Sequence, residues 1–183
     1  RPRLRYWLDR ILAEGMLDAS VAYGYFPVVS DGQEVVVLHH SDDDGGVLGV
    51  PGLLAPDGGS GGEIGTERLR FSFPRQRRDR HLCLADFVKA TGSGQVDVMP
   101  VQLVTAGAHV DEVTAEMFKR DAYRDYYELN GLVMQLTESL AEYWHSRIRA
   151  ELGFSDEEPT EVEGLFKLDY RGARFSLGYP ACP

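Results

Sequence analysis

The sequence predicts an α+β domain, and three observations support that class. After a short opening helix, the candidate strands are grouped in the first part of the chain. The longest helical pattern follows them, an order that favours α+β over a doubly wound parallel sheet. The chain of 183 residues is 43% hydrophobic and 26% charged, a composition typical of a globular domain with a core. We therefore expect one domain over residues 1–183.

The first elements are an amphipathic helix and an antiparallel hairpin. Leucine and isoleucine recur at helical spacing over residues 3–14, and Gly15 then provides a stop. Residues 21–27 and 34–39 are rich in β-branched and aromatic side chains, which is typical of strands. Residues 30–32, with the sequence SDG, supply the turn chemistry between them.

The middle of the chain contains two segments of unusual composition. Residues 41–62 hold eight glycines without periodicity, which predicts a mobile surface loop. A phosphate-binding loop is the weaker alternative, because the segment has neither a Lys-Ser/Thr ending nor the GxGxxG spacing. Residues 67–81 carry six arginines, and we expect a solvated strand end and loop. The alternative for this arginine segment is an electrostatic docking patch.

The remaining elements follow from length and periodicity. Residues 81–88 predict a loop or short helix, and residues 96–104 predict a further strand that ends at Thr105-Ala106-Gly107. Residues 111–152 contain no proline and one glycine, which predicts one or two long helices. Residues 155–163 are acidic and include Pro159, which predicts a surface connection. The long helical pattern buries an apolar stripe made of Leu129, Leu132, Val133, Leu136, Leu140, Tyr143 and Trp144.

Charge and cysteine content exclude several classes of partner and site. Nineteen basic against 29 acidic residues give a net charge of −10, so neither nucleic acid nor a membrane is an expected partner. No apolar run approaches the ~20 residues that span a bilayer. Cys83 and Cys182 form no CxxC pair, and no signal sequence is present, so we expect a cytoplasmic location. The terminal residues lead us to expect a fragment of a longer chain.

One helix face concentrates residues that could bind a ligand. Its members follow one another at spacings of four, three and four, so they share a face. Three interpretations remain open: a solvated face, a carboxylate that contacts a ligand, or half of a di-iron site without its second Glu-x-x-His. No GxSxG or HExxH motif is present, so no catalytic residue and no metal site are expected. The face consists of Glu138, Glu142, His145 and Arg149.

The C-terminal ten residues suit a small zwitterionic ligand. Arg174 can hold a carboxylate through two parallel hydrogen bonds, and Gly178 allows close approach of the backbone. Tyr179 offers ring or backbone contacts, and Pro180 stiffens the turn. A plain turn without any ligand is the alternative that these residues alone leave open.

The same residues resemble a known family signature. The run from Arg174 through Gly-Tyr-Pro-Ala-Cys-Pro is similar to the S-adenosylmethionine-binding signature of the activation domain of cobalamin-dependent methionine synthase. Segments 23–27, 83–88, 104–105 and 141–145 resemble further landmarks of this family in the same order. The resemblance covers nearly the whole chain, and the motifs together are highly specific.

The resemblance implies a fold and a role. It implies a twisted antiparallel sheet with long helices, forming the C-terminal part of a much larger methyltransferase of methionine biosynthesis. When the cobalamin of that enzyme is oxidised to cob(II)alamin, the family reduces it with an electron from a flavodoxin-type donor and remethylates it from S-adenosylmethionine. Cobalamin is carried by another domain. The implied partners are therefore that cobalamin-binding domain and the flavodoxin-type donor.

The resemblance also implies site residues. Arg174 would hold the methionyl carboxylate, Gly178 and Tyr179 would shape the adenosyl pocket with Pro180 beside them, and Glu138 would be a helix carboxylate at the site. Leu168 stands where the family has an acidic residue. A family aspartate and a downstream aromatic segment fall outside residues 1–183. The alternative is an interaction module that docks the reductant or the cobalamin domain without binding the ligand in this fragment.

Overall fold

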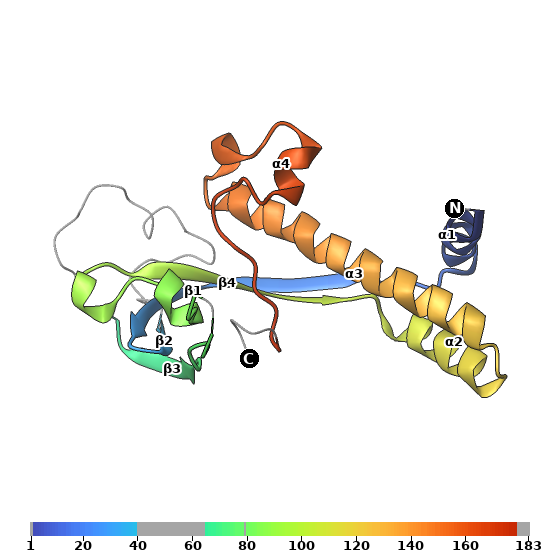
Figure 1. Ribbon diagram of the computed structural model, residues 1–183, viewed down its shortest axis with the longest axis horizontal. Coiled ribbons are helices and arrows are strands. Elements are labelled where there is room, and N and C mark those ends of the chain that lie inside the picture. The colour runs from blue at the N-terminus through green and yellow to red at the C-terminus, as the bar shows by residue number, and fades with distance from the viewer. Residues whose placement is uncertain (1, 40–64, 79, 179–183) are drawn as a thin grey trace. The chain divides into compact units, whose positions relative to one another are not determined.

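The computed structural model describes residues 2–39, 65–78 and 80–178 (Figure 1). The predicted loop at 41–62 lies outside these residues, as do Tyr179 and Pro180. The elements are, in chain order, α1 Pro2–Glu14, β1 Ser20–Asp31, β2 Glu34–Leu38, β3 Glu67–Ser72, the 3₁₀ helices η3 Leu84–Phe87 and η4 Thr91–Ser93, β4 Asp97–Thr105, α2 Ala108–Lys119, α3 Tyr123–Glu151, the 3₁₀ helix η5 Ser155–Glu157, and α4 Val162–Phe166.

The strands form one four-stranded sheet in the order β3-β2-β1-β4. The predicted hairpin is confirmed, because β1 pairs antiparallel with β2 from Val28 opposite Val37 to Asp31 opposite Glu34. β2 in turn pairs antiparallel with β3. The turn consists of Gly32 and Gln33, so it begins two residues later and ends one residue later than predicted. Gly32 takes the positive φ of 63° that lets the chain reverse. Antiparallel strands and separate helices confirm the α+β class.

The chain divides into two compact units that we describe separately. Unit 1 contains Arg1–Tyr23 and Gln102–Ile148, and unit 2 contains Gly24–Val101 and Arg149–Pro183. Three elements, β1, β4 and α3, contribute residues to both units. None of the described helices is long and apolar enough to cross a membrane.

The core of unit 1 lies among its three helices. Each of α1, α2 and α3 contributes fully or almost fully buried side chains to one apolar cluster. The long helical pattern forms two helices because the chain turns sharply at Asp121, where φ is 57°. In Figure 1, α2 and α3 run side by side from this turn. The buried members of the cluster are Trp7, Ile11, Met16, Val110, Met117 and Leu129.

Gly107 fixes the entry into α2. It adopts φ 92°, and a Cβ there would lie 2.7 Å from the carbonyl oxygen of Asp18. The amide of Asp18 donates a hydrogen bond to the carbonyl of Ala106 at 3.0 Å, so the two backbone segments are held in close approach. Only glycine satisfies both requirements.

The buried face of α3 changes direction along the helix. Leu129 is fully buried against α1 and α2, whereas Tyr143 is 58% exposed, so the predicted apolar stripe is wrong at that residue. Nearer its C-terminal end the helix packs on strand residues instead: Gln102 Nε2 donates to the carbonyl of Ala141 at 3.1 Å. Because the partner changes from helices to strands, a single straight stripe cannot describe the whole helix.

The core of unit 2 is built on both faces of the hairpin. Val29, Val36 and Leu38 are buried on one face, with the half-buried Val96 packed against them. The other face buries valines against the segment around η3, which confirms the predicted short helix at 81–88. The acidic connection at 155–163 is more ordered than predicted, because it contains η5 and the start of α4. The second face consists of Val28, Val35, Val37, Phe73, Cys83 and Ala85.

Candidate functional site

The candidate site centres on residues 167–178 of unit 2, which we call the C-terminal segment. Arg174 is half-buried, and its Nη1 donates to Ser176 Oγ at 3.4 Å. Gly178 adopts φ 87° in the left-handed region, and a Cβ there would meet no atom of the described residues within 4 Å. The backbone conformation therefore favours glycine at 178.

Aromatic contacts hold this segment on both sides of Arg174. Phe175 lies against Phe87 of η3, with ring centroids 5.2 Å apart. Arg171 lies over the ring of Phe154 at 4.1 Å and pairs with Glu157 at 3.1 Å. Arg174 therefore lies between two residues with packed side chains, on a stretch without regular secondary structure.

Among the described residues of unit 2, the most buried charge is that of Arg149, at the C-terminal end of α3. Arg149 is 2% exposed, and its guanidinium carbon lies 3.8 Å from the ring centroid of Tyr170. Its Nε and Nη2 both donate to the carboxylate of Glu158, the second at 2.9 Å. Gly164 closes the following loop, because any Cβ there would collide with the ring of Pro159.

The helix face identified from the sequence lies on α3. Glu138 is exposed in unit 1, and His145 Nδ1 lies 3.6 Å from Glu142 Oε1. The interpretation of the whole face as solvated is wrong, because His145 is 8% exposed and Arg149 only 2%. Arg149 is buried within unit 2, where the carboxylate of Glu158 and the ring of Tyr170 contact its guanidinium.

The structure brings some of the predicted site residues together. Arg174 and Gly178 lie on one segment of unit 2, whereas Glu138 belongs to unit 1. Tyr179 and Pro180 lie outside the described residues. Leu168, which the resemblance expects to be acidic, is exposed and adopts φ 58°.

The arginine segment is only partly neutralised. Arg70 pairs with Glu67, Glu34 and Asp31 at 2.7, 2.5 and 3.1 Å. Arg75 donates two hydrogen bonds to Asp86 at 2.6 Å each, which holds the pKa of that carboxyl below its usual range. All of β3 is exposed, which confirms the solvated strand end. Among the described residues of the segment 67–81, the arginines that make no ion pair are Arg68, Arg77, Arg78 and Arg80.

Sequence reasoning missed the residues that support the segment. Arg149 was found by its spacing on the helix face, but that spacing carries no information about burial. Tyr170 belongs to the Tyr-x-Gly that precedes Arg174, and Phe87 belongs to a family landmark. No sequence signal predicts that these aromatic rings contact the C-terminal segment, since those contacts join residues far apart in the chain.

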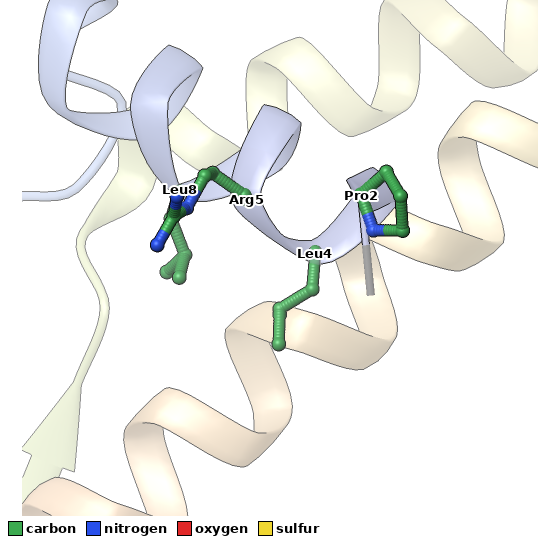
Figure 2. Close-up of a pocket in the computed structure, with 4 residues that line it drawn as sticks. All are labelled: Pro2, Leu4, Arg5 and Leu8. Atoms are coloured by element: carbon green, nitrogen blue, oxygen red, sulfur yellow. The ribbon is translucent and has the colours of Figure 1, made fainter.

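A cavity of about 580 Å³ lies at α1 in unit 1 (Figure 2). The residues that line it in the described part of the chain are Pro2, Leu4, Arg5 and Leu8. One cation among apolar side chains offers too few polar groups to orient a zwitterion. Of the residues expected to contact S-adenosylmethionine, those that the structure describes, Arg174, Gly178 and Glu138, are not among the residues that line this cavity.

Comparison with known proteins identifies the class of protein to which the chain belongs. The fold is that of a reactivation domain: a crystal structure of the MetH reactivation domain bound to AdoHcy matches with a TM-score of 0.75 and 25% identity. The match covers 98% of this chain and 50% of that one. A family model described as vitamin B12 dependent methionine synthase, activation domain, matches residues 5–183. The chain therefore belongs to the vitamin B12-dependent methionine synthase activation domain family.

Two relatives are similar over the whole chain. Methionine synthase of Mycobacterium tuberculosis (strain ATCC 25618 / H37Rv) is 49% identical over 194 residues, and that of Mycobacterium leprae (strain TN) is 47% identical. Both matches cover 100% of this chain. The chain spans only 15% and 14% of the lengths of these two relatives.

Proposed function

We propose that this chain is the reactivation module of a cobalamin-dependent methionine synthase and binds S-adenosylmethionine as the methyl donor for reductive remethylation of cob(II)alamin. Residues 1–183 act as one domain in this proposal. The observation that carries it is the structural similarity, over 98% of the chain, to a reactivation domain bound to AdoHcy. AdoHcy differs from S-adenosylmethionine by the methyl group that is transferred.

In this proposal, the task of the chain is to bind S-adenosylmethionine and to orient its methyl group. S-adenosylmethionine carries an electrophilic methyl group on its sulfonium, and the cobalamin of a neighbouring domain supplies the nucleophile. Methyl transfer between these two groups needs no acid or base from this chain. The chain would therefore contribute to the rate mainly through the proximity and orientation of the bound methyl donor. No residue of this chain is assigned to hold cobalamin.

Individual residues have assigned tasks in this proposal. The guanidinium of Arg174 holds the methionyl carboxylate by charge-assisted hydrogen bonds. Gly178 and Tyr179 shape the adenosyl pocket, with Pro180 stiffening the turn. Glu138 contributes a carboxylate on α3. The half-buried position of Arg174 and the left-handed φ of Gly178 support these assignments.

The proposal extends to the parent enzyme. The parent enzyme is a methyltransferase of methionine biosynthesis in the cytoplasm, and the cobalamin-binding domain of the same chain is the first partner. A flavodoxin-type donor supplies the electron.

Binding of S-adenosylmethionine tests the proposal. Equilibrium dialysis of the labelled compound against the full-length protein should show one saturable site per chain. Unlabelled S-adenosylhomocysteine should displace the label. Absence of saturable binding at millimolar ligand would refute the assignment.

One observation favours a second candidate function, the docking of an acidic protein. Four arginines of the segment 67–81 make no ion pair within the described ranges, and the exposed Leu69 and Phe71 alternate with arginines on β3. A basic patch on a chain of net charge −10 would attract an acidic donor in a salt-dependent way. Replacing Arg77 and Arg78 by serine should weaken donor binding at low salt and leave S-adenosylmethionine affinity unchanged. Loss of ligand affinity instead would assign the segment to the ligand site.

A further inference from the structure

Arg149, at the end of α3, carries a buried charge that the proposed chemistry does not use. Its side chain is 2% exposed, and burying a charge is costly unless that charge is paired. Among the groups that contact this guanidinium are the carboxylate of Glu158 and the ring of Tyr170. Nη2 lies 2.9 Å from Glu158 Oε2, and the guanidinium carbon lies 3.8 Å from the ring centroid.

These two contacts of Arg149 both fall on the stretch of chain that leads to Arg174. Tyr170 precedes Arg174 by four residues, and Glu158 lies at the start of the stretch. Between them the chain is closed tightly, since Gly164 packs directly on Pro159. Four residues reach about 14 Å at full extension, so fixing Tyr170 confines the backbone of Arg174.

A second contact confines Arg174 from the other side. Phe175 packs on Phe87, with ring centroids 5.2 Å apart. The backbone after Phe87 is itself tied to β1: Ser30 Oγ donates to the carbonyl of Val88 at 2.9 Å. The amide of Ser30 donates to the carbonyl of Lys89 at 2.8 Å. The residue proposed to hold the ligand carboxylate is therefore bracketed by two independent anchors.

We infer that Arg149 is a positioning residue for Arg174, acting through Tyr170 and Glu158. The inference rests on the proposed function for the role of Arg174 as the carboxylate-binding group. A segment without regular secondary structure would otherwise lose conformational entropy each time the ligand binds. The buried guanidinium orders that segment in advance, which raises affinity without any contact to the ligand.

Matched substitutions separate the ring contact from general stability. Tyr170→Phe keeps the aromatic face that meets the guanidinium, whereas Tyr170→Leu keeps an apolar side chain without a π-face. Arg149→Met combined with Glu158→Gln removes both charges of the ion pair together. This double variant leaves neither partner as an uncompensated buried charge.

Two measurements on the full-length protein decide the inference. Hydrogen exchange of amides 171–178, without ligand, should be faster in Tyr170→Leu and in the double variant than in Tyr170→Phe. Amides of β1 and β2 should keep their protection in all of them. The dissociation constant for S-adenosylmethionine should rise about tenfold in the first two variants, as expected if the ordered conformer falls to about one tenth of the population.

Coupling to Arg174 excludes a merely structural role. In an Arg174→Ala background, Tyr170→Leu should cause no further loss of affinity, because the group that it positions is absent. Equal losses in both backgrounds would overturn the inference, as would unchanged exchange at 171–178 or a Tyr170→Phe variant as weak as Tyr170→Leu. A wild-type protein that does not bind S-adenosylmethionine would overturn the proposed function, while the exchange data would still show whether Arg149 orders the segment.

Discussion

Removal of the Arg174 guanidinium is the most direct perturbation of the proposed site. Arg174→Ala deletes the group, and Arg174→Lys keeps its charge but loses the fork that matches a carboxylate. Lys167→Ala is the matched control: it removes one positive charge from an exposed position of the same C-terminal segment. Any effect of net charge alone should appear equally in the control.

The burial of Arg174 sets the expected magnitude. Fully exposed ion pairs contribute about 0–1 kcal/mol, whereas breaking a buried pair costs about 3–5 kcal/mol. Arg174 is half-buried, so its contribution should fall between these limits. The range for a hydrogen bond to a charged partner, about 1.5–3 kcal/mol, agrees with that position. A loss of ~2 kcal/mol corresponds to a dissociation constant roughly 30-fold higher.

Equilibrium dialysis with labelled S-adenosylmethionine measures the effect on the full-length protein. We expect Arg174→Ala to bind about 30-fold more weakly, Arg174→Lys to recover part of that loss, and Lys167→Ala to match the wild type. Thermal unfolding of each variant checks that the fold is intact. A dissociation constant for Arg174→Ala within twofold of the wild type would show that Arg174 is not part of the site. An equal loss of affinity in Lys167→Ala would show that the effect arises from net charge alone.

Three further predictions concern unit 1. Hydrogen bonds from Trp7 and two arginines lower the pKa of Glu128 to about 2, so its contribution to stability is complete above pH ~4.3 and is lost as the pH falls towards 2. Glu128→Gln should flatten that acid limb in urea melts, and an unchanged limb would contradict the assignment. Gly107→Ala should lower the free energy of unfolding by at least ~1 kcal/mol, because φ 92° and the nearby carbonyl of Asp18 both oppose a Cβ; a wild-type melting temperature would exclude this. Leu129→Ala, at a fully buried position, should cost about 3–5 kcal/mol in denaturant unfolding, and a cost below ~1 kcal/mol would show that the cluster repacks.

The sequence by itself determined the features that depend on neighbours along the chain. Helix α1, the hairpin of β1 and β2, and the helical character of residues 111–152 follow from local periodicity and turn residues, and the structure confirms each of them. The sequence left open whether that helical stretch is one helix or two. The family also followed from linear motifs, chiefly the run that begins at Arg174. Local patterns are readable because period and turn chemistry act over a few residues.

Only the tertiary structure decided which faces are buried and what holds the C-terminal segment. Tyr143 and Arg149 show the limit of periodicity: Tyr143 of the predicted apolar stripe is exposed, whereas Arg149 is buried against Glu158 and Tyr170. The ring of Tyr170 on Arg149, and Phe175 on Phe87, join residues separated by 21 and 88 positions. No local propensity encodes such contacts, since their energy arises only when the folded chain brings the partners together.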